Sequence, residues 1–161
     1  MARDPWQYIK PATLDDAVFL APRLRAADAA EIWAESHTLP LDALVLSLAN
    51  SSVAFTVHYG EPTAMFGLVP GSFLSGSARV WALGSDNNRG HRIKFLRHSR
   101  FIVDLLRQGY ECLYNYVDAR HKETLAWLRW LKADILPAAP YGVDGLPFHR
   151  FEWRQAPCVP A

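Results

Sequence analysis

The chain has 161 residues, of which half are hydrophobic and a fifth are charged. This length and composition are typical of one globular domain with a real core, and they exclude a disordered or fibrous chain. No apolar run approaches the length of a membrane span, and the first residues lack the apolar segment of a secretory signal. Two cysteines without a spacing motif argue against a disulfide framework and a zinc site. We therefore expect a reducing compartment and no metal.

Charge is unevenly distributed along the chain, although the net charge is only +1. Residues 1–78 carry four Lys or Arg and eight Asp or Glu, whereas residues 79–161 carry thirteen and eight. The positive half suits an anionic ligand near the middle of the protein. A nucleic-acid-binding module is the least favoured hypothesis, because no base-stacking motif accompanies its candidate residues. Those residues are Arg89, Arg92, Arg97 and Arg100.

The first half of the chain predicts a strand, a helical region and a β-hairpin. Alternation of large apolar and polar residues predicts the strand at Trp6–Lys10. Thr13 is a plausible N-cap for the first helix, because acidic residues follow it in the first turn. Helical spacing indicates residues 15–20, 26–35 and 41–48. Alternation then predicts a hairpin of residues 53–59 and 63–69, joined by Gly60-Glu61-Pro62.

The stretch Val80–Leu106 carries the main functional signal. A short apolar strand, Arg79–Leu83, is followed by a Gly-containing polar loop and by a long helix from about His91. This arrangement presents free backbone N–H groups and a positive dipole end to an anion. Positive side chains are added near the start of the helix by Arg89, Arg92 and Lys94. The stretch favours a phosphate-bearing ligand, although a glycine there also serves turn geometry alone.

The second half alternates strands and helices. Gly109 predicts the end of the long helix. The elements predicted after it are a strand at 110–117, a helix at 122–132, a short strand at 133–136, a stiff bend at 137–140 and a last strand at 146–153. We expect a single domain over residues 1–161, with a Pro-containing tail at 153–161. The order predicts an α/β (α+β) domain with a mixed sheet, in which Val80 to Val117 forms a right-handed parallel crossover.

The residues also resemble a known family. The strand-loop-helix Trp81–Leu106 and the stretch Tyr116–Leu131 are similar to the two motifs of the GNAT fold, the Gcn5-related N-acetyltransferases. The opening YIKPATLDDA resembles the usual start of that fold. Whole phrases, including MFGLVP, FLRHSR and GLPFHRFEW, more narrowly resemble small GNAT-like proteins of tailed bacteriophages, of the internal virion (core) protein A type. The resemblance implies a mixed, mostly antiparallel sheet of six to seven strands with helices on both faces.

The resemblance also implies which residues would hold acetyl-CoA. The backbone of the strand end would pair with the pantetheine arm, at Trp81, Ala82, Leu83 and Gly84. The loop N–H groups would hold the pyrophosphate, at Asn88, Arg89, Gly90, His91 and Arg92. The family loop usually reads Gln/Arg-x-x-Gly-x-Gly/Ala. If Gly90 is its first glycine, Asn87 and Arg92 depart from the pattern, and His121 stands where the second motif usually has Asn.

The activity implied is acetyl transfer from acetyl-CoA to an amine, which requires donors for an oxyanion and a base for the amine. Three candidate catalytic residues are Glu61, Glu111 and Tyr116. We also considered His58, Tyr114 and Asp118. Structural alternatives are favoured for most of these residues: a solvent-facing strand position for His58, turn chemistry for Glu61, core positions for Tyr114 and Tyr116, and a helix cap for Asp118.

Two functions remain open on the sequence. The first is an acetyl-CoA-dependent N-acetyltransferase. The second is a catalytically inactive GNAT-fold virion protein that acts through protein–protein contacts, with other virion proteins or a second copy as partners. The departures in the phosphate loop, the six tryptophans and the Pro-containing tail favour the second. Either protein would belong in the host cytoplasm or the virion, and the fold alone does not decide between them.

Overall fold

The computed structural model describes residues 4–72 and 74–155. Within these ranges the backbone alone is described at Pro5, Asn87, Asn88, Arg89 and Arg92. The described chain contains five α-helices, which are α1 (Leu14–Leu20), α2 (Ala26–Ser36), α3 (Pro40–Asn50), α4 (Arg92–Leu106) and α5 (Lys122–Trp130). Its strands are β1 (Ile9–Pro11), β2 (Val53–His58), β3 (Pro62–Pro70), β4 (Ser77–Gly84), β5 (Cys112–Asp118), β6 (Asp134–Ile135), β7 (Ala139–Tyr141) and β8 (Leu146–Arg154).

One twisted sheet contains all eight strands, in the order β1-β2-β3-β4-β5-β8-β6, with β7 also paired to β8. Neighbours are antiparallel except for β4 and β5, which are parallel and joined through α4. The α/β prediction with a mostly antiparallel mixed sheet is therefore confirmed. The strand count exceeds the expected six to seven because part of the predicted bend at 137–140 is strand β7. Proline suits an edge strand, where no N–H is needed for the ladder, and Pro140 pairs with Pro147.

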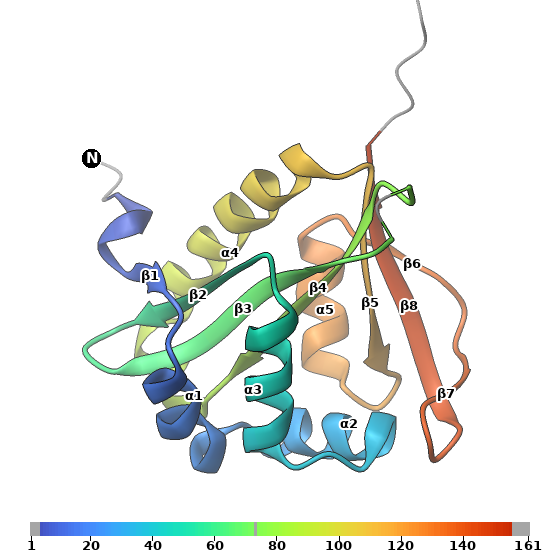
Figure 1. Ribbon diagram of the computed structural model, residues 1–161, viewed down its shortest axis with the longest axis horizontal. Coiled ribbons are helices and arrows are strands. Elements are labelled where there is room, and N and C mark those ends of the chain that lie inside the picture. The colour runs from blue at the N-terminus through green and yellow to red at the C-terminus, as the bar shows by residue number, and fades with distance from the viewer. Residues whose placement is uncertain (1–3, 73, 156–161) are drawn as a thin grey trace, which may run out of the picture.

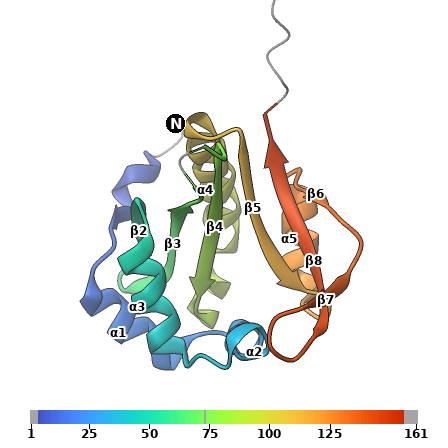
Figure 2. The ribbon, with the colours of Figure 1, turned by 45° about the vertical axis from the view of Figure 1, so that its right-hand side comes forward.

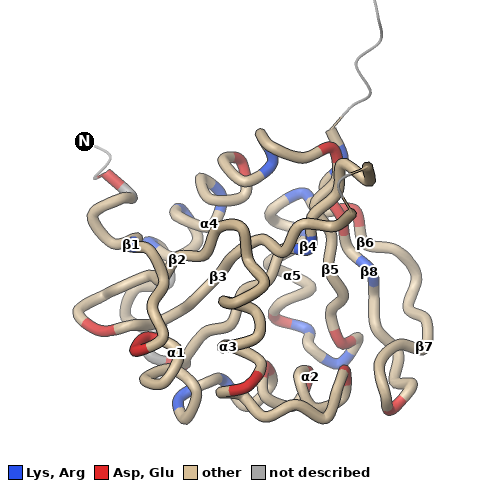
Figure 3. The backbone as a smooth tube through the Cα atoms, in the orientation of Figure 1, with Lys and Arg blue, Asp and Glu red and all other residues tan. Residues whose placement is uncertain are grey.

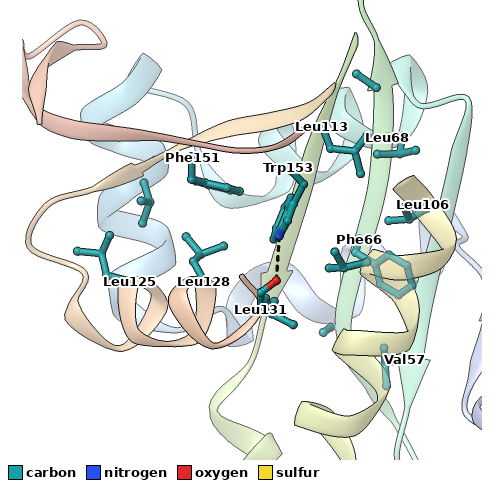
Figure 4. Packing of buried hydrophobic residues seen from close by; sticks show 14 of the residues in the cluster. Val57, Phe66, Leu68, Leu106, Leu113, Leu125, Leu128, Leu131, Phe151 and Trp153 are labelled. Atoms are coloured by element: carbon teal, nitrogen blue, oxygen red, sulfur yellow. Dashed lines mark hydrogen bonds between the residues drawn. The ribbon is translucent and has the colours of Figure 1, made fainter. Parts of the chain in front are cut away.

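Helices cover both faces of the sheet (Figure 1). On one face α1 and α3 pack over a small cluster that includes Leu20, Leu44 and Met65. On the other face α4 and α5 enclose the larger core, part of which is drawn in Figure 4. There the indole Nε1 of Trp153 donates a hydrogen bond of 3.0 Å to the carbonyl oxygen of Leu131, so the ring fills the core without an unpaired donor.

The predicted N-cap of the first helix is confirmed as a capping box. The backbone N–H of Asp16 donates to Thr13 Oγ1 at 3.2 Å, and the N–H of Thr13 donates to Asp16 Oδ2 at 3.0 Å. Buried Asp16 also accepts a 2.9 Å hydrogen bond from the hydroxyl of Thr56. The cap therefore fixes α1 against β2 as well as starting the helix.

Two local predictions were wrong. The expected strand Trp6–Lys10 begins only at Ile9, because Pro5–Gln7 forms a 3₁₀ turn whose Trp6 ring packs on Phe55 and Phe101. The expected loop 85–90 is largely the 3₁₀ turn Asp86–His91, which leads directly into α4. The last strand extends through Arg154, and residues 156–161 of the expected tail lie outside the described residues.

Candidate functional site

The central feature of the site is the divergence of β4 and β5. The two parallel strands pair over three residue pairs only, from Ser77 with Cys112 to Arg79 with Tyr114. Beyond that point they separate, as Figure 2 shows, and α2 lies across their separating ends. The last five residues of β4 therefore have β3 on one side and no neighbouring strand on the other.

The open side of β4 presents backbone groups from every second residue. Asn115 Nδ2 donates a 2.7 Å hydrogen bond to the carbonyl oxygen of Val80, so the backbone groups of Val80 face this side. Because backbone groups alternate along a strand, those of Ala82 and Gly84 face it too, whereas those of Trp81 and Leu83 face β3. On the open side, no described residue hydrogen-bonds to Ala82.

The end of β4 is already hydrogen-bonded by the start of α2. The N–H of Gly84 donates to Asp28 Oδ2 at 3.1 Å, and its carbonyl oxygen accepts from the N–H of Arg25 at 3.0 Å. Of the four strand residues expected to contact the pantetheine arm, only Ala82 thus presents open backbone groups within the described chain. Gly84 is on the same side with its groups paired, and Trp81 and Leu83 face away.

A buried polar cluster links α2 to the end of β5. Glu31 Oε2 accepts a 2.9 Å hydrogen bond from the N–H of Asp118 and lies 3.4 Å from His121 Nδ1. The other ring nitrogen of His121 is 3.1 Å from the Thr124 hydroxyl and 3.9 Å from Asp28 Oδ1. His121 thus lies at the mouth of the divergence, between carboxylates, at the position where the resemblance placed an Asn.

Asp118 caps the turn that precedes α5 rather than α5 itself. Its Oδ1 accepts from the backbone N–H of Arg120 at 2.8 Å, and its carboxylate pairs with the Arg120 guanidinium. Burial acts to raise the pKa of Asp118, but the hydrogen bonds and charge of Arg120 outweigh it and hold that pKa below its ordinary value. Asp118 is therefore a carboxylate at neutral pH whose interactions hold the turn together.

Tyrosines and arginines line the sheet on the α2 side of the divergence. Arg79 donates from Nε to Asn115 Oδ1 at 2.8 Å and forms an ion pair with Glu35. The hydroxyl of Tyr141 donates to Glu35 at 3.0 Å, and its ring stacks on Tyr116 with centroids 3.9 Å apart. Burial, with the nearby Glu35 carboxylate, raises the pKa of Tyr141 to about 12 against the opposing charge of Arg79. The surface therefore combines stacked rings with paired charges.

The three candidate catalytic residues lie in different places. Tyr116 is on the separating part of β5, where its hydroxyl lies 3.4 Å from an Arg150 nitrogen. Glu111 precedes β5 at the closed end, with its N–H bonded to the carbonyl of Gly76. Glu61 is exposed in the turn between β2 and β3. The structure therefore brings Tyr116 to the divergence and does not bring these three residues together.

The structure corrects the solvent-facing alternative for His58 and leaves Tyr114 partly buried rather than in the core. His58 faces α1, with Nε2 3.5 Å from the Asp16 carboxylate, and is partly buried. The Tyr114 ring is covered by the Arg150 guanidinium at 4.2 Å.

The loop after β4 leads into the longest helix. Gly90 is exposed in the 3₁₀ turn, and α4 then begins at Arg92 without a side-chain cap. The His91 ring stacks on Tyr59 with centroids 4.6 Å apart. Lys and Arg recur along α4 in Figure 3. The predicted roles of Asn88, Arg89 and Arg92 concern backbone N–H groups in this turn, and their side chains lie outside the described part.

Several residues of the site were missed by sequence reasoning. They are Arg25, Asp28, Glu31, Glu35, Arg79, Asn115 and Tyr141. One signal was available, because Asp28, Glu31 and Glu35 are spaced by three and four residues and so share a face of α2. A second was the polar Asn115 in the middle of a strand.

Comparison with known proteins identifies the fold. No protein-family model and no curated protein matches the sequence. Among solved structures, the ribosomal-protein-alanine N-acetyltransferase of Brucella melitensis superposes with a TM-score of 0.68 at 17% identity, over 91% of this chain and 99% of that one. The fold is that of the GNAT N-acetyltransferases.

Two further structures with the GNAT fold are similar over nearly their whole lengths. The Salmonella typhimurium protein yncA, solved with its cofactor acetyl-CoA, has a TM-score of 0.67 at 12% identity, covering 94% of this chain and 95% of that one. The ribosomal-protein-S18-alanine N-acetyltransferase of Escherichia coli has a TM-score of 0.65 at 13% identity, covering 95% and 97%. Identities this low show the fold and leave activity to be argued from the site.

Proposed function

We propose that the protein binds acetyl-CoA at the open edge of β4 and transfers the acetyl group to an amine. The observation that carries the proposal is the exposed pair of backbone groups on Ala82, on a strand edge that leads through a turn to the start of α4. An extended, amide-containing chain pairs with such an edge as an added strand. The helix start beyond it suits a diphosphate. Two GNAT-fold relatives named as N-acetyltransferases, and one solved with acetyl-CoA, support the same activity.

The residues present fit the cofactor in part. The Ala82 N–H is placed to donate to an acyl carbonyl oxygen and to stabilise negative charge as it develops there. The basic α4 would supply positive charge at the anion-binding end, whereas the 3₁₀ turn Asp86–His91 uses backbone N–H groups of the expected loop in its own hydrogen bonds. Acetyl-CoA would supply an acetyl group already activated as a thioester. Against this fit, Val80 and Gly84 already have partners within the chain.

We assign proton transfer to the divergence of β4 and β5. Tyr116 is the catalytic candidate that lies there, and its hydroxyl is 3.4 Å from Arg150 Nη1. Glu61 and Glu111 remain candidates from the sequence, without a position at the open edge.

We further propose a bacteriophage setting, which rests on the resemblance of whole phrases of the sequence. In that setting the protein acts in the host cytoplasm or the virion. Its partners are other virion proteins or a second copy of the chain.

A second candidate function is a virion protein without catalysis, which works through protein–protein contacts. One observation favours it: large apolar side chains are exposed on α1 and α3, two helices that contact each other. They are Leu14, Val18, Leu41 and Leu46. The partners already held by Val80 and Gly84 favour it as well.

Calorimetric titration of the folded protein with acetyl-CoA tests the enzyme proposal. The matched variants are Ala82→Pro, which removes the N–H on the open side, and Ala82→Val, which keeps it. We expect Ala82→Pro to weaken binding by roughly three- to tenfold, as for one lost hydrogen bond, and Ala82→Val to bind like the parent. Absence of binding at millimolar acetyl-CoA by folded protein would overturn the proposal and leave the second candidate.

A further inference from the structure

The segment Leu24–Asp28 extends the sheet where β5 has left it. Leu24 forms an antiparallel bridge with Ser85, directly beyond the end of β4. The N–H of Arg25 donates to the carbonyl of Gly84, and the carboxylate of Asp28 accepts from the N–H of Gly84. Both backbone groups of Gly84 that face the open side are therefore taken by one short stretch of chain, which we call the edge segment.

Hydrogen bonds to a buried carboxylate hold the edge segment in place. Asp28 is buried, and its two oxygens accept from Arg25 Nε at 3.1 Å and Arg25 Nη2 at 2.8 Å. Three residues further along α2, Glu31 accepts from the N–H of Asp118 on β5. The start of α2 thus bonds to the end of β4 and, one turn later, to the end of β5, across the mouth of the divergence.

A ligand that pairs with this strand edge needs more than Ala82. Along the open side the next groups are those of Val80, whose carbonyl is bonded by Asn115, and those of Gly84, which the edge segment holds. Acetyl-CoA carries the amide groups of its arm between the thioester and the diphosphate, so an extended arm with its thioester at Ala82 would reach the next backbone groups on its diphosphate side. That side is the Gly84 end of β4, which leads to the 3₁₀ turn Asp86–His91 and the basic α4.

We propose that the edge segment and acetyl-CoA compete for the backbone groups of Gly84, so that binding requires Leu24–Asp28 to leave β4. The inference rests on the proposed function and adds a controlling step to it. The apparent affinity is then the intrinsic affinity multiplied by the fraction of molecules with the edge segment released. Weakening the edge segment raises that fraction and tightens binding, the opposite of what most substitutions near a binding site do.

A matched pair of variants at Arg25 isolates the competing hydrogen bond. Arg25→Pro removes the N–H that donates to Gly84, and its ring would occupy the place of that hydrogen. The backbone accepts proline, because φ is −54° at Arg25 and the preceding Leu24 is extended, with φ −57° and ψ 145°. Arg25→Ala loses the same side chain and keeps the N–H. Any difference between the two variants therefore reports on the backbone bond.

The experiment is acetyl-CoA titration of the full chain and both variants, together with hydrogen exchange at the Gly84 amide. We expect Arg25→Pro to bind on the order of tenfold more tightly than Arg25→Ala, with faster Gly84 exchange in the free protein. Equal or weaker binding by Arg25→Pro, while the parent binds, overturns the competition and leaves the proposed function intact. No binding by any of the three folded proteins overturns the proposed function and the competition together.

A second pair keeps the inference testable if Arg25→Pro does not fold. Asp28→Ala removes the acceptor for the Gly84 N–H, whereas Asp42→Ala makes the same change at an exposed position on α3. Tighter binding by Asp28→Ala alone supports the competition. Matching affinities for these two variants and the parent overturn it.

Discussion

The side-chain amide nitrogen of Asn115 lies 2.7 Å from the carbonyl oxygen of Val80, at the point where β5 leaves β4. The amide oxygen of the same residue accepts from Arg79 Nε and from the N–H of Tyr116. One partly buried side chain therefore satisfies the last backbone acceptor before the strands part and holds an arginine on the opposite face. The residue stabilises the start of the divergence.

Replacing Asn115 with alanine is expected to lower the free energy of unfolding. The change leaves the Val80 carbonyl without its side-chain donor and the Arg79 guanidinium with Glu35 alone, which costs about 1–3 kcal/mol for a poorly solvated polar group. Urea unfolding followed by circular dichroism measures it. Asn50→Ala is the control, because that amide bonds only a carbonyl in its own exposed helix end. A loss no larger than that of Asn50→Ala would contradict the assignment.

Gly67→Ala is expected to destabilise the fold through crowding between strands. A Cβ at this position would stand 2.6 Å from the Val53 carbonyl oxygen and 2.9 Å from Trp81 Nε1, closer than atoms pack. The cost is about 1–3 kcal/mol, seen as a lower midpoint in urea. Gly109→Ala meets no atom within 4 Å and provides the matched control, with little change or a small gain. Equal stability of the two variants would refute the close approach at Gly67.

Asp118 gives the stability a predictable dependence on acid. Its folded pKa is below the ordinary value of 3.8, so its stabilising contribution is complete above that value and is lost as pH falls through the folded pKa. We expect the Asp118→Asn variant to have a lower free energy of unfolding than the parent at neutral pH. As the pH falls from about 5 to about 2, a window around and below the ordinary pKa, the variant should lose less of that free energy than the parent does. Urea titrations at several pH values measure the slope. The exposed Asp134→Asn should follow the parent.

The salt dependence of that same contribution provides a second check on Asp118. The Arg120 side chain is 60% exposed, so part of the interaction is screened by salt. The difference between parent and Asp118→Asn should shrink at high ionic strength while the hydrogen bond to the backbone N–H persists. A difference independent of salt would assign the whole effect to hydrogen bonding.

Two tyrosines are expected to ionise late. Burial and the neighbouring Tyr8 raise the pKa of Tyr59 to about 12, and burial raises that of Tyr141 to about 12 as well. Because the folded pKa is raised, their contribution to stability is complete below the ordinary pKa of 10 and is lost as pH rises through 12. Ultraviolet titration of folded protein should show two of the six tyrosines ionising last.

Single variants assign those late steps. Tyr59→Phe and Tyr141→Phe should each remove one late equivalent from the titration and leave the other. If either variant instead lost a tyrosine that ionises near pH 10, the pKa of the replaced tyrosine would not be raised, and the prediction would be wrong. Tyr59 OH lies 3.0 Å from His98 Nδ1, so Tyr59→Phe should also alter the titration of that histidine.

The sequence allowed the architecture to be predicted because its signals are local. Alternation at residues 53–59 and 63–69, the acidic first turn after Thr13 and the glycine at 109 each act over a few residues, and each marks an element that the structure contains. The parallel crossover through α4 follows from element order alone. Irregular turns were less predictable, because the 3₁₀ turns at Pro5–Gln7 and Asp86–His91 depend on what the rings and strands around them allow.

The state of the site could not be predicted in the same way. The contacts that occupy the edge of β4 join residues far apart in the chain, such as Asp28 with Gly84 and Asn115 with Val80. They exist only because β4 and β5 diverge and α2 crosses the gap. The resemblance indicated which strand would carry the cofactor, and the pairing of its backbone had to come from three-dimensional structure.

The three residue pairs between β4 and β5 have a consequence for folding. Among the joints that link β2, β3, β4, β5 and β8 they are the narrowest, with seven residue pairs each in β3–β4 and β5–β8 on either side. Each half of the sheet is built from antiparallel neighbours and could fold largely on its own. The pairing of β4 with β5, which we call the seam, forms only after α4 has brought the chain back to the sheet. Rupture under force or partial denaturation should therefore start at this seam and produce two half-sheets, with the crossover helix as their tether.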